Sequence, residues 1–390
     1  MSTSRAVRLA LSLILGAAGL TGCGGGGGST PSTVGGGGSG GRSTGGGSGA
    51  GKAAIIGLVT MGEASEDPSH PPANSFAEIN THPGVYKGAV IDLYWSQLEP
   101  EQGVFDDTAL QEALASIAAY NAKYPTTPVE AKLRIYAGAG TPAWVISATG
   151  AVTLTDTTKA GQVITFTTGE FWTTAYQGFW RGLQAHLASE YDASPQIAEV
   201  AISSCSSTTG EPFITPHTAA DILTLHQAGY TDALEEACLS AAPQDYAVWS
   251  RTPLDFTFNP LILTDSGAAV LDTTFPVTLM QSFRASLGAR GVVANHGLDS
   301  PIGPEQEPIY AEFTALYQQA QGHTPPAPAP LEFQTAGPTV DWPTVFALGL
   351  TYHPTEFEIW DTTAAGGLAP LSLAQLQQFA AQIAAANPNS

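Results

Sequence analysis

Short apolar, β-branched runs alternate with longer amphipathic stretches along the chain after Lys52. Eight of the short runs have the composition of strands: residues 54–60, 88–95, 131–137, 197–203, 254–259, 291–295, 331–335 and 356–360. The longer stretches have helical spacing and cover residues 108–122, 171–191, 231–242, 275–290, 305–321, 342–350 and 371–386. Strands that alternate with helices favour a parallel sheet with right-handed crossovers, and eight repeats over about 340 residues predict a (β/α)8 barrel.

An open, doubly wound sheet is the competing arrangement. It is disfavoured because no G-x-G-x-x-G motif follows a strand in this part of the sequence, so nothing marks a dinucleotide-binding crevice. After the third strand, Val152 and Leu154 alternate with polar residues before Lys159-Ala160-Gly161, and Ile164 and Phe166 alternate after it. This pattern predicts a β-hairpin over residues 151–167, inserted after the third strand.

The first 22 residues have the features of a secretory signal peptide. Arg5 and Arg8 precede an apolar run over residues 9–15 that is too short to span a membrane. The following Leu20-Thr21-Gly22-Cys23 resembles the lipobox of bacterial lipoproteins, whose cysteine receives the lipid and becomes the mature N-terminus. We therefore expect lipidation at Cys23 and an extracytoplasmic location, anchored to a bacterial membrane at the cell surface or in the periplasm. An ordinary signal peptide with an unrelated cysteine is the alternative.

After Cys23, residues up to Lys52 are almost only glycine, serine and threonine. Such a segment cannot bury enough apolar area to become ordered, so residues 23–52 are predicted to form a flexible tether with a reach of roughly 30 Å. Gly37-Gly38-Ser39-Gly40-Gly41 formally matches the G-x-S-x-G motif of serine hydrolases. Because no strand precedes it and no helix follows it, we set that match aside. Residues 53–390 are then expected to form one domain.

The chain carries 34 acidic residues against 13 lysines and arginines, a net charge of −21. Because this charge has the wrong sign for phosphate backbones, we expect no nucleic-acid partner. The eight histidines are scattered, and the sequence has no H-E-x-x-H motif and no cysteine cluster, so no metal or cofactor is expected. Cys205 and Cys238 remain after Cys23 is assigned to lipid, and the sequence leaves open whether they form a disulfide. We expect a monomer.

Three segments resemble a known enzyme family. From Trp95 to Asp106 the sequence is Trp-Ser-Gln-Leu-Glu-Pro-Glu-Gln-Gly-Val-Phe-Asp, after the second strand. The third strand continues to Thr141-Pro142-Ala143-Trp144, and Phe179-Trp180-Arg181-Gly182-Leu183 begins a helix that leads into the fourth strand. Together they resemble the large clan of retaining (β/α)8 glycoside hydrolases, which includes β-galactosidases and cellulases. The resemblance covers about residues 88–213 and identifies no subfamily.

The resemblance implies two catalytic carboxyl groups, an acid/base at the end of the fourth strand and a nucleophile at the end of the seventh. Glu211 is the first carboxylate after the fourth strand, although Gly210 stands where the family has asparagine. In the seventh strand the period of two puts Glu332 and Gln334 on one face, which makes Glu332 the first nucleophile candidate. Glu358, in the eighth strand, is the rival candidate.

The other predicted site residues are aromatic and polar groups near strand ends: Trp95, Arg134, Trp144, Asn295, His296 and Trp360. The three tryptophans are expected to line the cleft or stack on sugar rings, and the Asn-His pair to hydrogen-bond sugar hydroxyls. Because a glutamate inside a barrel needs a site or a cation, Arg134 is expected to orient Glu332.

The sequence therefore predicts a surface-anchored glycoside hydrolase that cleaves a neutral oligo- or polysaccharide by a two-carboxylate, retaining mechanism. An inverting mechanism would replace it if the two carboxyl groups lie about 6.5–9.5 Å apart. A catalytically inactive barrel that binds glycan at the cell surface is the alternative, because the family's Asn-Glu pair is missing.

Overall fold

The computed structural model describes residues 51–61, 74, 76–157, 163–208, 210–214, 218–324, 326–335, 341–359 and 371–387. These residues belong to the compact unit Gly49–Ser390. The predicted signal peptide, Cys23 and nearly all of the tether lie outside the described residues, and so does Trp360.

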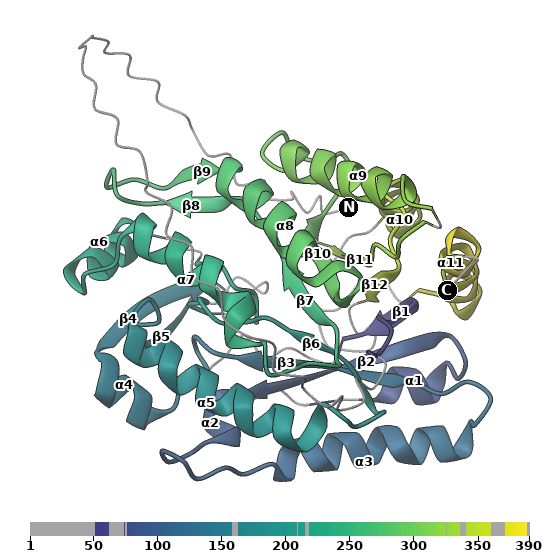
Figure 1. The fold of residues 1–390 in the computed structure, drawn as a ribbon, viewed down its shortest axis with the longest axis horizontal. Helices are drawn as coiled ribbons and strands as arrows, with labels where there is room; N and C mark the ends of the chain where they lie inside the picture. The colour runs from purple at the N-terminus through teal and green to yellow at the C-terminus, as the bar shows by residue number, and fades with distance from the viewer. Residues whose placement is uncertain are drawn as a thin grey trace, which may run out of the picture. The chain divides into compact units, whose positions relative to one another are not determined.

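Eight parallel strands close into a barrel (Figure 1). In order around the barrel they are β1 (Gly57–Thr60), β2 (Tyr86–Tyr94), β3 (Glu130–Tyr136), β6 (Ile197–Ala201), β7 (Leu254–Thr257), β10 (Gly291–Leu298), β11 (Leu331–Thr335) and β12 (Glu356–Ile359). The barrel closes where β12 pairs with β1. All eight correspond to the predicted strands, so the predicted (β/α)8 fold is confirmed.

Helices cover the outside of the barrel (Figure 1). The seven predicted helices are α3 (Thr108–Lys123), α5 (Thr174–Tyr191), α7 (Asp232–Asp245), α8 (Thr274–Leu287), α9 (Glu307–Gln321), α10 (Trp342–Leu350) and α11 (Leu373–Ala386). Helix α5 begins three residues later than predicted because the Thr173 side chain caps it, accepting a hydrogen bond from the Tyr176 N–H. Helix α11 likewise begins after Ser372, which forms a capping box with Gln375.

The connections that follow strand ends hold additional short elements. These are α1 (Ala77–Thr81), α2 (Trp95–Leu98), α4 (Ala143–Thr149), α6 (Ala219–Gln227) and two antiparallel pairs, β4 (Ala151–Thr157) with β5 (Val163–Gly169) and β8 (Leu261–Leu263) with β9 (Val270–Asp272), whereas the 3-10 turn Gly288–Arg290 instead precedes β10. Helix α6 connects the two pairs: Thr155 donates to Asp221, and His226 contacts Thr264. Because these connections leave the carboxyl ends of barrel strands, they surround the end where sites form in this fold.

The strands separate an apolar exterior from a polar interior. Phe333 and Phe357 face outward and pack against aromatic side chains of α9 and α10, among them Tyr310, Phe313 and Phe346. Each fully buried ring of this kind contributes about 1.5–3 kcal/mol of hydrophobic stabilisation. The alternate positions of β11 and β12 carry buried polar groups instead, namely Glu332, Gln334, Glu356 and Glu358. The shared face predicted for Glu332 and Gln334 is therefore confirmed.

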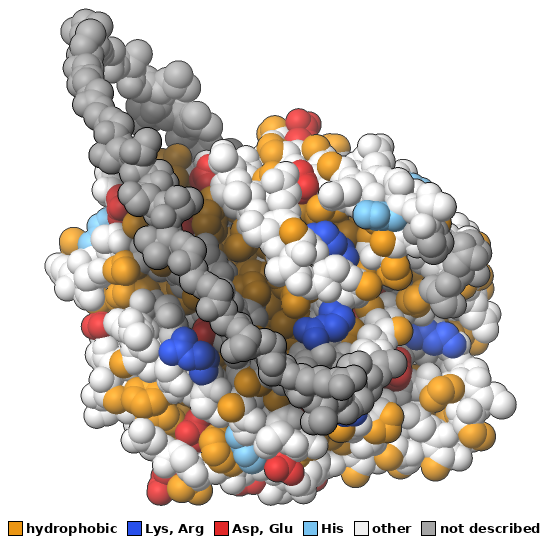
Figure 2. Space-filling model, in the orientation of Figure 1, with side chains coloured by type: hydrophobic (Ala, Val, Ile, Leu, Met, Phe, Trp, Pro, Cys, Tyr) orange, Lys and Arg blue, Asp and Glu red, His pale blue; other side chains and the backbone are white. Residues whose placement is uncertain are grey.

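Acidic side chains are scattered on the face seen in Figure 2 rather than gathered in one patch. Part of the acidic charge lies inside the barrel, where the carboxyl groups described below are almost completely buried. Within the described part of the chain, no helix has the length and apolar character needed to cross a membrane.

Candidate active site

The barrel interior contains an unusually dense set of charged groups, which we call the interior cluster. It comprises six carboxyl groups and three groups that can carry positive charge: Asp92, Glu199, Asp255, Glu332, Glu356 and Glu358 with Lys132, Arg134 and His296. Each of these residues has an exposed fraction of at most 6%. Charges so far from water must be paired or neutralised by protons.

Lys132 lies at the centre of the deeper part of this cluster. Its Nζ lies 2.7 Å from Asp255 Oδ2, 2.6 Å from Glu356 Oε1, 3.1 Å from Glu358 Oε1 and 3.3 Å from Glu199 Oε2. Burial opposes the charge on Lys132, but the carboxylates around it, Asp255 first, raise its pKa well above the ordinary value. Lys132 is therefore a permanent cation that connects four barrel strands.

Arg134 pairs with Glu358. Its Nη2 donates to both oxygens of the Glu358 carboxylate, at 2.6 and 2.7 Å. Burial alone would favour the neutral acid, but Arg134 and then Lys132 hold the pKa of Glu358 well below its usual range. Glu358 is thus ionised and engaged by two cations, and Arg134 lies beside Glu358 rather than beside Glu332 as predicted from the sequence.

His296 lies between Glu211 and Glu332. Its Nδ1 is 3.0 Å from Glu211 Oε1 and its Nε2 is 3.2 Å from Glu332 Oε2. Burial opposes protonation of the ring, but the carboxylates of Glu332 and Glu211 raise its pKa to about 10. The imidazolium therefore donates one N–H to each carboxylate, and the cation beside Glu332 is His296 rather than the predicted Arg134.

The remaining carboxyl groups hold protons more readily than exposed ones. Burial raises the pKa of Glu199, Asp255, Glu332 and Glu356, and that of Asp92 to about 6. Glu199 and Glu356 face the same cation, Lys132 Nζ, at 3.3 and 2.6 Å, and the charge of Glu199 further raises the pKa of Glu356. The six carboxyl groups can be buried with only three cations because those with raised pKa values can be protonated and therefore neutral.

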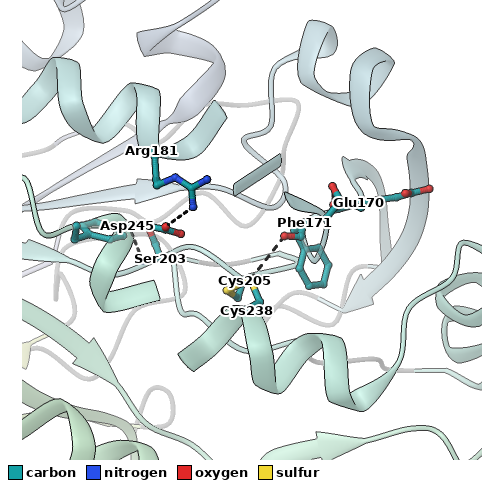
Figure 3. Close-up of a disulfide and its surroundings, with 9 residues drawn as sticks. Glu170, Phe171, Arg181, Ser203, Cys205, Cys238 and Asp245 are labelled. Atoms are coloured by element: carbon teal, nitrogen blue, oxygen red, sulfur yellow. Dashed lines mark hydrogen bonds and ion pairs between the residues drawn. A yellow bond between two sulfur atoms is a disulfide. The ribbon is translucent and has the colours of Figure 1, made fainter. Parts of the chain in front are cut away.

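Glu211 differs from the interior cluster because it reaches solvent. Its side chain is 30% exposed, against 0% for Glu332. It follows β6 in a loop that is fastened at several points. Cys205 in this loop forms a disulfide with Cys238 of α7 (Figure 3), and the Ser203 N–H donates to the Tyr246 hydroxyl at 3.0 Å. The disulfide left open by the sequence is therefore present and holds the loop that carries Glu211.

Two glycines allow this loop to lie close to β3. A Cβ on Gly138 would collide with the backbone of Ser207, and a Cβ on Gly210 would lie 2.5 Å from Arg134 Cδ. Real Cβ atoms do not approach so closely, so both positions require glycine for close approach rather than for an unusual dihedral angle. Gly210 thereby brings the residue before Glu211 against the side chain of Arg134.

A metal ion would find a partial donor set in this region. His296, Glu332 and Glu358 each present one ligand atom within 4.8 Å of the others. However, Arg134 and Lys132 contact Glu358, and both ring nitrogens of His296 face carboxylates. These cationic side chains supply the positive charge that a metal ion would bring, so the donor set does not fit one.

Comparison with known proteins yields structural matches alone. No family model matches the chain, and no curated protein matches its sequence. Endo-glycoceramidase II from Rhodococcus sp., in complex with a five-membered iminocyclitol, has a TM-score of 0.50 at 12% identity, covering 83% of this chain and 79% of that chain. The β-galactosidase from Rahnella sp. R3 has a TM-score of 0.46 at 11% identity, over 86% of this chain and 58% of that chain. At 12% identity, the first match supports the (β/α)8 fold and nothing finer.

Trp95 and Trp144, the two predicted tryptophans that the structure describes, do not meet at the site. Trp95 has an exposed fraction of 0% and packs edge-on against Trp144, Tyr176 and Trp180. Its predicted role as a sugar-stacking residue is wrong, because the chain turns into helix α2 at this residue and directs the ring into the core. Trp144 is partly buried in the same packing and donates its Nε1–H to the Glu99 carbonyl.

Asn295 is also more deeply placed than expected. It is fully buried, and its amide is hydrogen-bonded to Phe258, Asn259, Gly297 and Tyr310. The amide of Asn295 is therefore engaged by neighbouring residues of the protein, whereas His296, the next residue, contacts both candidate carboxyl groups.

Sequence reasoning missed Lys132, Glu199, Asp255 and Asn259 as members of the site. A signal was present for Lys132, because it stands two residues before Arg134 in an apolar strand and so shares its face. Asp255 lies between apolar residues in β7 and offers the same kind of signal.

Proposed function

We propose that this protein is a glycoside hydrolase in which Glu211 and Glu332 are the two catalytic carboxyl groups. The observation that carries the proposal is that one imidazole, that of His296, contacts both, at 3.0 and 3.2 Å. Glycoside hydrolysis needs one carboxyl group that can donate a proton and one that is ionised. An exposed glutamate and a buried one joined through a protonated histidine provide two such unlike environments.

The proposed reaction is a retaining double displacement; if the two carboxyl groups stay about 6.5–9.5 Å apart when substrate is bound, an inverting reaction replaces it. Glu211 donates a proton to the glycosidic oxygen while a carboxylate oxygen of Glu332 attacks the anomeric carbon, so that the bond to the leaving group breaks as the glycosyl ester forms. In the second step Glu211 takes a proton from water, the water oxygen attacks the anomeric carbon, and Glu332 leaves as a carboxylate. His296 holds both carboxyl groups in place and carries a proton next to Glu211 throughout.

Glu358 is assigned a structural role in this proposal. Both of its oxygens accept hydrogen bonds from Arg134, and Lys132 lies 3.1 Å away. A carboxylate whose pKa is held far below its usual range is a weak nucleophile, because attack would have to break these ion pairs. Glu332 contacts a single cation, His296, so fewer ion pairs are lost when it forms a covalent bond.

The substrate class follows from the charge of the chain. The chain carries a net charge of −21, so a uronic acid or sulfated sugar would be repelled, and a neutral oligo- or polysaccharide is favoured. The membrane anchor at Cys23 belongs to the same proposal: a lipid on Cys23 would hold the barrel near the surface where such polymers are found. Loss of detergent-phase partitioning in Cys23→Ser would support this attachment, and unchanged partitioning would refute it.

The proposal is tested by hydrolysis of a panel of aryl β-glycosides and plant or microbial polysaccharides. Wild type should turn over at least one substrate, and Glu211→Gln and Glu332→Gln should each reduce kcat by about 100-fold or more. Glu112→Gln, an exposed substitution on α3, is the matched control and should retain full activity. Activity that survives both site substitutions would refute the proposal.

A glycan-binding barrel without turnover is the second candidate. One observation favours it: the Glu332 side chain is fully buried, and the residue one step nearer the mouth on the same strand face is Gln334, which cannot act as a nucleophile. In that case no substrate of the panel would be cleaved, but one polysaccharide would retard the protein in affinity electrophoresis. Retardation would then be unchanged in Glu332→Gln.

A further inference from the structure

Asn259 contacts the candidate acid from the side opposite to His296. Asn259 follows β7, and its Nδ2 donates to Glu211 Oε2 at 3.0 Å, while His296 Nδ1 lies 3.0 Å from Oε1. Each oxygen of Glu211 therefore faces a nitrogen donor. Hydrogen bonds donated to a carboxylate favour its ionised form and lower its pKa.

The orientation of the Asn259 amide is fixed by a chain of hydrogen bonds. The Gly297 N–H, which can only donate, points to Asn295 Oδ1 at 2.9 Å, and the Tyr310 hydroxyl donates to the same oxygen at 2.7 Å. Asn295 must then present its Nδ2 on the other side, where it donates to the Phe258 carbonyl and to Asn259 Oδ1, at 2.7 and 3.2 Å. With its oxygen so engaged, Asn259 can only turn its NH2 group toward Glu211.

We propose that Asn259 is a positioning residue that sets the proton affinity of Glu211, and that Tyr310, through Asn295, keeps the Asn259 amide in the donating orientation. The consequence for catalysis rests on the proposed function: a general acid must be protonated, so Asn259 would determine the pH above which activity declines. None of these three residues was expected to act on Glu211 from the sequence.

Other charged groups also face Glu211 and must be held constant in a test. His296 approaches from β10, with Glu332 on its far side, and Arg134 and Tyr136 approach from β3 beneath Gly210. A useful variant therefore alters Asn259 or Tyr310 alone. Tyr352 provides a matched control, because its ring contacts that of Tyr310 and lines the same surface cavity of about 530 Å³.

The test is a carbon-13 NMR titration of glutamate carboxyl groups in the full chain, with the Glu211 signal assigned by its loss in Glu211→Gln. Asn259→Ala should raise the pKa of Glu211 by about one unit, and Tyr310→Phe should raise it by less. Asn259→Asp, which keeps the size of the side chain, should raise it further by adding a like charge. Tyr352→Phe should leave it unchanged. Titration curves that coincide for wild type, Asn259→Ala and Asn259→Asp would overturn the proposal.

Activity measurements separate this proposal from the proposed function. If wild type hydrolyses a substrate, the basic limb of the kcat/KM profile should move to higher pH in Asn259→Ala, and a smaller shift should appear in Tyr310→Phe. If the titrations shift but wild type cleaves no substrate, the proposed function fails while the role of Asn259 toward Glu211 stands. If wild type is active and the titrations do not shift, the proposed function stands while the role of Asn259 toward Glu211 fails.

Discussion

Gly210 lies against the side chain of Arg134, so closely that a Cβ on the glycine would be 2.5 Å from Arg134 Cδ and 2.7 Å from Cγ. The glycoside hydrolases that the sequence resembles have asparagine at this position, before the acid/base glutamate. Here Arg134 extends across the barrel to Glu358 and occupies the space that an asparagine side chain would need. The glycine at position 210 is therefore coupled to the buried Arg134–Glu358 ion pair.

The first prediction is that asparagine at position 210, as in the glycoside hydrolases that the sequence resembles, is harmful. Gly210→Asn should displace Glu211 or the Arg134 side chain, lower the free energy of unfolding by about 1–3 kcal/mol and reduce hydrolysis. Urea denaturation and initial rates measure both effects. Gly182→Ala is the control, because nothing lies within 4 Å of a Cβ at that exposed helical position, and it should be neutral or slightly stabilising. A gain of activity in Gly210→Asn would contradict this explanation.

The second prediction distinguishes the two interior glutamates by stability. Glu358→Gln removes one partner of a buried ion pair and should lower the free energy of unfolding by about 3–5 kcal/mol. Because its folded-state pKa is depressed, this contribution is present above the unfolded pKa and is lost as the pH falls below it. Glu332→Gln should cost less, since Glu332 contacts one cation, His296, whereas Glu358 contacts both Arg134 and Lys132. Denaturation at pH 7 compares them, and equal losses would count against the assignment of Glu358 as the structural member.

The third prediction concerns Asp92, whose pKa burial raises to about 6. A carboxyl group that binds protons more tightly in the folded state destabilises that state as the pH rises from about 4 through 6. Asp92→Asn should therefore stabilise the protein relative to wild type, by an amount that grows over this interval to at most about 3 kcal/mol. Asp106→Asn should show no such gain, because hydrogen bonds from Thr108 lower the pKa of Asp106. A stability difference for Asp92→Asn that does not vary between pH 4 and 7 would contradict the prediction.

The fourth prediction concerns the disulfide that fastens the Glu211 loop. Cys205 and Cys238 are 33 residues apart in the sequence. Their replacement together by alanine should reduce the free energy of unfolding by about 2–4 kcal/mol. Activity should fall as well, because the loop from Ser203 to Glu211 loses its bond to α7. Thermal unfolding with and without a reductant provides the check: wild type should lose stability on reduction, whereas the double variant should not respond.

The sequence predicted the eight strands and the inward direction of Glu332 because both follow from local patterns. A β-branched run of four to eight residues specifies a buried strand, and the period of two specifies which side chains enter the barrel. The same period explains why Lys132 and Arg134 share the interior with Glu356 and Glu358.

The pairing of these groups could not be predicted in the same way. Arg134 and Glu358 are 224 residues apart, and their contact depends on the closure and stagger of the barrel rather than on either strand. The prediction that Trp95 stacks on sugar rings was wrong for a different reason. A motif suggested a cleft residue, but packing among Trp144, Tyr176 and Trp180 decided its position.

The assignment of Glu332 as the nucleophile is tested most directly by trapping the glycosyl ester. The protein is incubated with the 2-deoxy-2-fluoro derivative of the aryl glycoside that it hydrolyses fastest, and its peptides are then sequenced by mass spectrometry. We expect one sugar attached to the carboxyl group of Glu332. A sugar on Glu358, or substrate hydrolysis with no sugar on either glutamate, would contradict it.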